Sequence, residues 1–333
     1  ESGAPMQLFR NHFDATSSAP GVKQLKYLYD VDTPRRRTTA PHLAYVKVAE
    51  GCNYSCAFCI IPTLRGSYRS RPPDSIVTEA RAMAERGVKE LILISQDTTM
   101  YGLDRNDRGA LPRLLHALND IDGLEWIRLL YLYPTTIGAD TIDAIADCDK
   151  VCNYIDLPLQ HAADRVLKRM GRPGTRLSYE RLLESIRHRI PEVALRTTFI
   201  VGFPGETDEL FLETYNFLND LDISYLHVFT YSERDNTIAA EMEDVVPLKV
   251  RKKRSKMLRG LSAKKRRAFY ESQMDTQRTV LFEGENKKGY IHGFTENYVK
   301  VKAPWDPALV NTTHSIELKE IDDDGMVRFE YCT

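Results

Sequence analysis

The 333-residue chain contains no run of eighteen or more apolar residues, so the sequence predicts no membrane-spanning helix. Its first residues, ESGAP, have neither the basic segment nor the apolar core of a secretory signal peptide. The formal net charge is only −1, so the overall composition has no excess of positive charge typical of nucleic-acid-binding proteins. Of the six cysteines, three lie within eight residues, which is typical of a reducing compartment and not of a disulfide framework. These absences predict a cytoplasmic protein with no membrane partner.

The three clustered cysteines are Cys52, Cys56 and Cys59, in the run CNYSCAFC at residues 52–59. They follow an apolar run at 43–48 that predicts a strand. Thiolates are the usual protein ligands of iron–sulfur clusters. Three thiolates on one short loop match three irons of a 4Fe-4S cluster and leave the fourth iron open for a reactant. In radical enzymes such an open iron binds S-adenosylmethionine, which makes this loop the strongest signal in the chain.

Other interpretations of the same cysteines stay open at this point. A structural zinc site needs four ligands, and no Cys or His follows at the usual spacing, but a zinc-bearing RNA-binding module is the main alternative from another class. A disulfide with one leftover thiol would fit a secreted protein. Plain buried thiols would need no metal at all.

From residue 43 to residue 229, predicted strands and helices alternate. Apolar runs predict strands at 43–48, 90–95, 126–131, 154–159, 194–201 and 224–229. Amphipathic patterns predict helices at 74–87, 111–120, 139–146, 165–170, 179–189 and 208–218, the first with Asp74 as its N-cap. Because parallel strands need helical crossovers, these units predict an α/β fold with a partial (βα)6 barrel.

Polar and glycine residues follow several of these strands, and reactive groups in α/β barrels collect at the carboxyl ends of strands. The candidates at strand ends are Gln96, Asp97, Gln160, His161, Gly202, Gly205 and Glu206. Arg196 lies at the start of the fifth strand. Each has an ordinary alternative: GFPG at 202–205 forms a turn by itself, Arg196 is a surface cation, and a lone histidine is more often structural than catalytic.

The segments EGC at 50–52, CIIP at 59–62 and RGSYRSR at 65–71 together resemble the radical S-adenosylmethionine methylthiotransferases. The resemblance runs from about residue 38 to the C-terminus. It implies a radical-SAM barrel at 42–245 in which an external donor supplies an electron, S-adenosylmethionine is cleaved, and a substrate C–H becomes C–SCH3. Members of the family carry a second 4Fe-4S cluster on three cysteines of an N-terminal domain. Cys148, Cys152 and Cys332 do not reproduce that pattern, so we expect residues 1–41 to be a linker remnant and the chain to be a fragment that cleaves S-adenosylmethionine without methylthiolating.

The resemblance also implies roles for the candidates. Phe58 would lie against the adenine, and Arg196 would pair with the cofactor carboxylate in a fork geometry. Glycines 202 and 205 would let the backbone approach the cofactor closely. The resemblance further implies that Gln96, Gln160 and Glu206 bind cofactor. The substrate-site candidates are Asp97, His161, Arg69 and Arg71.

After residue 245 the composition changes. Residues 246–274 predict a connecting helix with eleven Lys or Arg between 249 and 267 and no acidic residue between 245 and 270. It is either a solvated face or a contact for RNA or the ribosome. Five short alternating runs at 279–282, 289–294, 298–301, 315–321 and 326–331 predict a small β-barrel at 275–333, similar to the OB-like TRAM module of methylthiotransferases.

Different segments of the chain resemble branches of the family that act on different substrates. AEGC at 49–52, QDTTMYG at 96–102 and LQH at 159–161 are similar to the branch that modifies an aspartate of a small-subunit ribosomal protein. TYSERDNT at 230–237 and GFTENYVK at 293–300 are closer to the branch that modifies an adenosine beside the tRNA anticodon. The first set lies in the core that would hold the reacting carbon. We therefore expect the ribosomal protein to be the substrate, with tRNA as the alternative.

Overall fold

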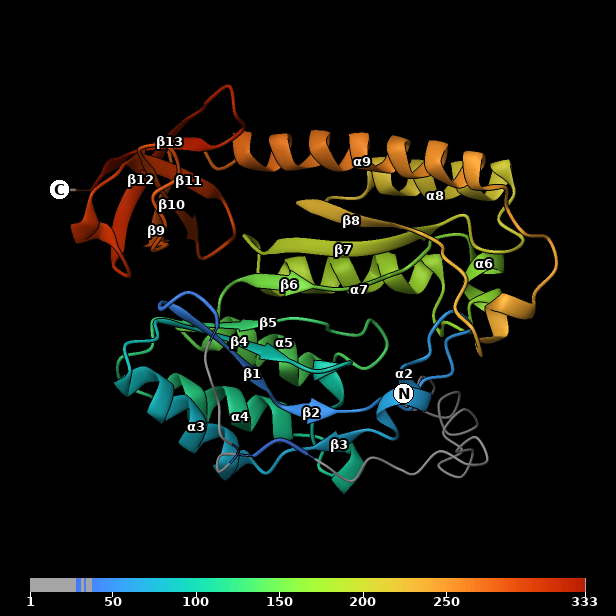
Figure 1. The fold of residues 1–333 in the computed structure, drawn as a ribbon, viewed down its shortest axis with the longest axis horizontal. Coiled ribbons are helices and arrows are strands. Elements are labelled where there is room, and N and C mark those ends of the chain that lie inside the picture. The colour runs from blue at the N-terminus through green and yellow to red at the C-terminus, as the bar shows by residue number, and fades with distance from the viewer. Residues whose placement is uncertain (1–27, 31–32, 34–37, 333) are drawn as a thin grey trace.

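The computed structural model describes residues 28–30, 33 and 38–332, so the predicted linker remnant at 1–41 lies largely outside the described residues. The core has six parallel strands in two sheets (Figure 1). One sheet has the order β1 (Leu43–Lys47), β4 (Glu90–Ile94), β5 (Trp126–Leu129). The other has the order β6 (Tyr154–Asp156), β7 (Ala194–Val201), β8 (Tyr225–Thr230). A parallel bridge between Ile127 and Val151 joins the sheets, so the predicted partial barrel is confirmed.

Helices connect these strands at the predicted places: α3 (Pro73–Glu85), α4 (Ala110–Asn119), α5 (Ala139–Asp147), α6 (Asp164–Arg169), α7 (Arg176–Arg189) and α8 (Asp208–Asp220). The predicted N-cap of α3 is wrong. Pro72 is the N-cap residue, and Asp74 lies inside the first turn without a capping hydrogen bond. Two consecutive prolines preset the start of this helix, and the carboxylate of Asp74 is still favourable beside the positive end of the helix dipole.

The apolar faces of these strands and helices pack into one continuous core. Strands β1, β4 and β5 contribute fully buried aliphatic side chains such as Val46, Leu91 and Leu129. Helix α4 contributes Leu111, Leu114 and Leu115 from one face. Burying a side chain of this size stabilises the fold by about 1.5–3 kcal/mol, so the core fixes the strand ends that carry the polar candidates.

The basic segment forms one long helix, α9 (Leu248–Glu271), which lies along the outer edge of β8 (Figure 1). Ser262 ties the two together, because its hydroxyl accepts from the Leu226 N–H and donates to the Leu226 carbonyl. The helix therefore covers an edge strand whose backbone groups would otherwise be open. Within the described part of the chain, no helix has both the length and the apolar character needed to cross a membrane.

The C-terminal strands close into a barrel, which confirms the predicted small β-barrel. They are β9 (Gln277–Phe282), β10 (Tyr290–Thr295), β11 (Lys300–Pro304), β12 (Thr313–Ile321) and β13 (Val327–Tyr331). The barrel order is β10-β11-β13-β12-β9. Its own core contains Phe282, Ile291 and Leu318 among other buried apolar side chains. The boundaries between the predicted domains stay a prediction.

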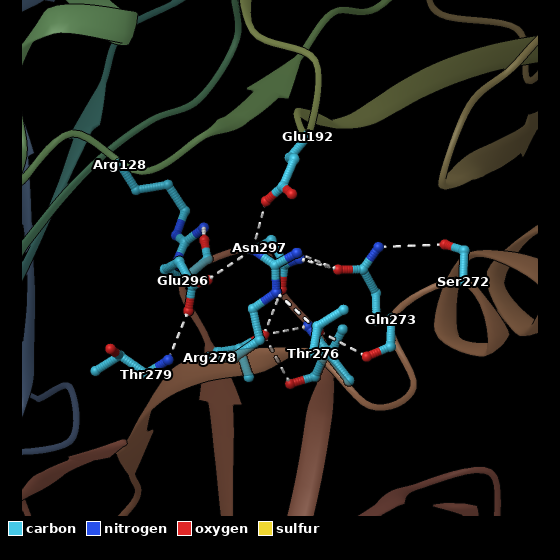
Figure 2. Close-up of polar contacts among 11 residues, drawn as sticks. Arg128, Glu192, Ser272, Gln273, Thr276, Arg278, Thr279, Glu296 and Asn297 are labelled. Carbon is cyan, nitrogen blue, oxygen red and sulfur yellow. Dashed lines mark hydrogen bonds and ion pairs between the residues drawn. The ribbon is translucent and has the colours of Figure 1, made fainter. Parts of the chain in front are cut away.

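The C-terminal barrel contacts the amino ends of the parallel strands (Figure 2). Arg278 on β9 forms ion pairs with Glu192, which precedes β7, at 3.0 Å and with Glu296 at 3.3 Å. The backbone carbonyl of Glu296 accepts a hydrogen bond of 2.7 Å from Arg128 on β5. The carboxyl ends of the strands, where chemistry is expected, therefore lie at the other end of the parallel sheets.

Candidate cofactor site at the cysteine loop

The two ends of the cysteine loop are held together by a pair of short strands that the sequence did not predict. We call this pair the neck of the loop. Two short strands, β2 (Ala49–Glu50) and β3 (Arg69–Ser70), pair antiparallel, and helix α2 (Ile61–Arg65) lies between the loop and β3. The Cys52 N–H donates to the Gly66 carbonyl at 3.1 Å, and the Gly51 N–H donates to Gln96 Oε1 at 2.9 Å. Gln96, a predicted cofactor ligand, thus holds the entry of the loop.

Further backbone hydrogen bonds hold the middle of the loop against the other half of the fold. The Ala57 N–H donates to the Met170 carbonyl at 2.8 Å, and the Ala57 carbonyl accepts from Ala239 N–H at 2.8 Å. Met170 ends α6, and Ala239 lies in a short 3-10 helix, η3 (Ile238–Glu241). The loop is consequently fixed from both sides before any cofactor binds.

Gly51 is a position where only glycine fits. Its φ of +89° is a left-handed conformation, and a Cβ there would lie 2.2 Å from the Ser67 carbonyl oxygen. We expect Gly51→Ala to lose most of the iron bound after reconstitution, because about 1–2 kcal/mol of backbone strain adds to a clash with backbone. The matched control is Gly289→Ala, which has a similar φ of +84° but nothing within 4 Å of the new Cβ. Equal iron content in both variants would contradict this account of the neck.

The three loop cysteines are free and only half-buried. Burial, with the neighbouring Cys56 and Cys59 adding to it, raises the pKa of the Cys52 thiol to about 12. Burial also raises the pKa of Cys59. Raised pKa values keep the Cys52 and Cys59 thiols protonated at neutral pH until a metal binds, since a coordinating thiol is deprotonated outright.

Across residues 28–30, 33 and 38–332, no three His, Cys, Asp or Glu side chains converge closely enough to hold a single metal ion. A mononuclear zinc site needs all its sulfurs about 2.3 Å from one point, so the structure offers no ligand set for the zinc interpretation. A 4Fe-4S cluster makes a different demand, because each thiolate binds its own iron and the three sulfurs stand apart. Three free thiols on one anchored loop fit that demand.

Arg172 lies beside the loop and was not predicted. It follows α6, is 6% exposed, and its Nη1 lies 4.0 Å from Cys56 Sγ. The Pro158 carbonyl accepts from its Nη2 at 2.7 Å, and its guanidinium stacks on the Tyr133 ring at 3.9 Å. No carboxylate in the described part of the chain forms an ion pair with it. A buried cation needs an opposite charge, and an anionic thiolate-bound cluster at Cys56 would supply one.

Several buried oxygen atoms beyond the carboxyl ends of the strands have no hydrogen-bond partner within the described residues. They are Tyr133 Oη after β5, Thr135 Oγ1, Gln160 Oε1 after β6 and Tyr231 Oη after β8. Tyr133 stacks on Tyr54 of the loop with the ring centroids 4.0 Å apart. Buried polar atoms are normally hydrogen-bonded, so this set indicates a place for a polar ligand. Gln160 also has a φ of +73°, an uncommon backbone conformation outside glycine that is often found at functional sites.

Phe58 points into a small aromatic cluster next to these atoms. Its ring meets Phe203 edge-on at 6.4 Å, and Phe203 meets Tyr231 at 5.4 Å. Phe58 is only partly buried, so part of its surface remains available to a ligand. Its place is compatible with the predicted contact to an adenine ring.

Glu206 and His161, both predicted as site residues, bind each other and further groups of the protein. Both side chains are fully buried, and His161 Nε2 lies 3.2 Å from Glu206 Oε2. The Ala163 N–H donates to His161 Nδ1, so the ring proton is on Nε2 and is donated to the carboxylate. Glu206 also accepts from the Gly202 N–H at 2.9 Å and pairs with Arg254 of α9 at 2.7 Å. This network shapes the turn at 202–206.

The glycines of this turn make room for side chains of the protein itself, and their predicted approach to the cofactor stays a prediction. Both have left-handed φ values, +77° at Gly202 and +83° at Gly205. A Cβ on Gly202 would lie 2.3 Å from Arg251, and one on Gly205 would lie 2.6 Å from Arg169. The missing side chains make room for arginines of the protein, so close approach to a cofactor is not required to explain them.

The remaining predicted candidates lie at different places, and of these Arg69 belongs to β3 at the base of the cysteine loop. Arg196 lies near the amino end of β7, five residues or about 17 Å from the strand's last residue, and pairs with Asp156 at 3.4 Å. Arg71 is fully buried and pairs with Glu79 at 2.7 Å, whereas Arg69 donates to the backbone carbonyls of Ser67 and Arg65. All three are therefore engaged in internal contacts.

Asp97 is close to the loop but is enclosed. It is fully buried, and its carboxylate accepts from the Tyr54 hydroxyl at 2.9 Å and from the Thr99 and Thr136 side chains. Burial raises the pKa of Asp97, and these hydrogen bonds offset part of that rise. Its observed role is to hold Tyr54 of the cysteine loop, so a direct contact with substrate would require this network to open.

Comparison with known proteins matches the chain to one family. A model described as the radical SAM superfamily covers residues 46–218. The ribosomal protein uS12 methylthiotransferase RimO of Geotalea uraniireducens is 45% identical over 79% of this chain and 58% of that protein. The protein of the same name from Moorella thermoacetica is 46% identical over 87% of this chain and 67% of that protein. The chain thus spans about three fifths to two thirds of the length of these curated relatives.

Among solved structures, the fold is similar to the radical S-adenosylmethionine methyltransferase TsrM from Kitasatospora setae, a structure with cobalamin and a 4Fe-4S cluster bound. The TM-score is 0.50 at 21% identity, and the match covers 60% of this chain and 38% of that chain. This likeness concerns the fold alone.

Proposed function

Because the chain belongs to the radical SAM superfamily, in the family of the ribosomal protein uS12 methylthiotransferases, we propose that it holds a radical centre on its cysteine loop. The superfamily implies a 4Fe-4S cluster and S-adenosylmethionine. The proposal is that Cys52, Cys56 and Cys59 bind three irons and leave the fourth for the cofactor. The observation that carries it is the set of three free thiols on a loop anchored beyond the carboxyl ends of the strands.

When bound, the cluster and S-adenosylmethionine supply a deoxyadenosyl radical that abstracts hydrogen from an unactivated carbon. The chain's own residues have three tasks. Gln96 and the β2–β3 pair hold the loop in place. Arg172 balances negative charge at Cys56. Phe58, Gln160 and Tyr231 offer an aromatic face and unpaired oxygens to the cofactor. Of the predicted cofactor ligands, Arg196, Glu206 and the two glycines have the weakest support, because protein groups already occupy their surroundings.

The proposed reaction is methylthiolation of an aspartate in small-subunit ribosomal protein uS12. The support is the printed function of the relatives at 45–46% identity, since nothing in the cysteine loop itself selects a substrate. The tRNA alternative is not favoured by these relatives. An external electron donor is part of the proposal, and a ribosomal substrate implies a cytoplasmic reaction.

The first test is anaerobic reconstitution with iron and sulfide, followed by EPR of the reduced protein with and without S-adenosylmethionine. We expect four irons per chain, as one 4Fe-4S cluster requires, a spectrum that changes when S-adenosylmethionine is added, and release of 5′-deoxyadenosine. A cluster whose EPR spectrum does not change on addition of S-adenosylmethionine would overturn the radical mechanism. Substrate choice is then read from the release of 5′-deoxyadenosine with uS12 or with tRNA added, because we expect this chain to cleave S-adenosylmethionine without completing methylthiolation.

A further inference from the structure

Helix α9 carries a concentration of positive charge that the proposed chemistry does not use. Of its eleven Lys and Arg, three are buried or half-buried and bind other groups of the protein, and the exposed Arg259 donates to the Val228 carbonyl. Arg251 and Arg254 are buried and bind the Tyr231 carbonyl, Glu233, Glu206 and Asp208. Lys265 donates to the carbonyls of Asn219 and Leu221 at the end of α8. These three have structural roles.

The other eight cations are exposed: Lys249, Lys252, Lys253, Lys256, Arg259, Lys264, Arg266 and Arg267. At 100° per residue they all fall on one side of the helix, opposite the face that carries Leu258 and Leu261. Only Arg267 has an ion pair with a carboxylate in the described chain, with Glu271 at 2.8 Å. Without these eight cations the formal net charge of −1 would become −9, so the molecule's charge is strongly asymmetric. We call this surface the outer face of α9.

The middle of the outer face carries small residues and no long side chain. Gly260 lies there, with no atom within 4 Å of where a Cβ would be, and Ala263 next to it is exposed. Glycine inside a helix costs stability relative to alanine, and nothing in this fold requires its small size. A bare strip between rows of cations lets an extended polyanion approach the helix backbone closely.

We propose that the outer face of α9 binds ribosomal RNA next to the substrate protein, so that the chain recognises its target within the small ribosomal subunit. The identity of this particle rests on the proposed function, whereas the affinity for RNA phosphates rests on the outer face alone. Clustered lysines and arginines neutralise phosphates and release their counterions. Helix α9 is about 36 Å long, enough to follow several phosphates.

RNA fits this face better than a lipid surface does. Helices that lie on membranes insert an apolar face beside their cations. The apolar face of α9 is used within the protein, since Leu258 and Leu261 are buried in the main core. Arg254 and Arg251 also connect α9 to the turn at 202–206 and to Tyr231, so the helix that would bind RNA is in direct contact with elements around the proposed radical site.

The test measures binding of the chain to purified small ribosomal subunits and to their extracted RNA over a series of salt concentrations. The variant is Lys252→Gln, Lys253→Gln, Lys256→Gln, whose exposed side chains form no hydrogen bond or ion pair among the described residues. The matched control removes equal charge elsewhere: Arg81→Gln, Arg108→Gln, Arg181→Gln, all exposed. We expect the α9 variant to lower the slope of log K against log salt by about 2–3, and the control to leave it unchanged.

Equal binding by the α9 variant and the unmodified chain would overturn the inference, as would equal losses in variant and control. Binding to phosphatidylserine vesicles but not to the RNA would identify a membrane contact instead and also overturn it. None of these measurements needs a cluster or S-adenosylmethionine. Failure of the proposed radical chemistry would appear in the EPR experiment and is therefore distinguishable from failure here.

Discussion

Replacing Cys52, Cys56 or Cys59 singly by serine is expected to abolish the S-adenosylmethionine-dependent EPR change and the release of 5′-deoxyadenosine. Each thiol in the proposal binds its own iron, and a hydroxyl is a poor substitute for a thiolate at iron–sulfur clusters. With two remaining ligands the cluster is held too weakly to keep one defined open iron. Iron content after desalting should fall well below that of the unmodified chain, and the three variants should behave alike.

The chain offers its own controls for this prediction. Cys148 is buried behind α5, near His116, and Cys332 lies at the end of the C-terminal barrel. Serine at either position leaves the loop untouched, so iron content and the EPR signal should stay at the level of the unmodified chain. If Cys148→Ser or Cys332→Ser lost iron as severely as Cys56→Ser, the assignment of the cluster to the loop would be wrong. A normal EPR signal in any of the three loop variants would also contradict the assignment of the cluster to the loop.

The order of elements was predictable because each has its own local signal. The continuous apolar runs at 90–95 and 194–201 correspond to β4 (Glu90–Ile94) and β7 (Ala194–Val201), both buried parallel strands. Gly87 ends α3 with a φ of +82°, as its position after an amphipathic run indicates. The loop thiols were predictable because their spacing alone limits the chemistry that they suit.

The orientation of polar side chains was less predictable. Sequence places Glu206, His161 and Arg196 on or just after strands, but it does not say whether a partner from another element is already bound. The partner of Glu206 is Arg254, which comes from α9 far along the chain. The partner of Arg196 is Asp156, the last residue of β6. Long-range pairing of this kind has no local pattern, so the sequence did not reveal these partners, and the site roles of Glu206, His161 and Arg196 stay predictions.

Arg172 lies beside the cysteine loop but was not identified from the sequence. It lies in a short loop after α6 and 116 residues beyond Cys56, and no motif connects the two. Only the fold brings it beside the cysteine loop, because the Ala57 N–H binds the Met170 carbonyl and Gly171 packs on the Ser55 carbonyl. Its burial without a carboxylate partner is a property of the packed structure, which sequence alone does not reveal.

Arg128 is expected to be the largest single contributor among the charged residues that join the parallel strands to the C-terminal barrel. It is 1% exposed and pairs with Glu90 at 2.6 Å. It also donates to the Glu296 carbonyl at 2.7 Å, and its guanidinium lies 4.0 Å from the Tyr298 ring (Figure 2 shows Arg128 and Glu296). Both of the last contacts are to the turn between β10 and β11.

Arg128→Ala should therefore lower the free energy of unfolding by about 3–5 kcal/mol, measured by urea denaturation of the cluster-free chain, because Glu90 is left buried without its partner. The surface control is Arg113→Ala, which breaks the exposed pair with Asp107 and should cost no more than about 1 kcal/mol. Changing both partners together, Arg128→Met with Glu90→Leu, removes the uncompensated charge, so the double variant should be more stable than Arg128→Ala. A loss for Arg128→Ala no larger than for Arg113→Ala would show that this buried pair does not hold the two parts together. Recovery in the double variant would show that the cost comes from the unpaired carboxylate, whereas no recovery would assign it to the lost contacts with Glu296 and Tyr298.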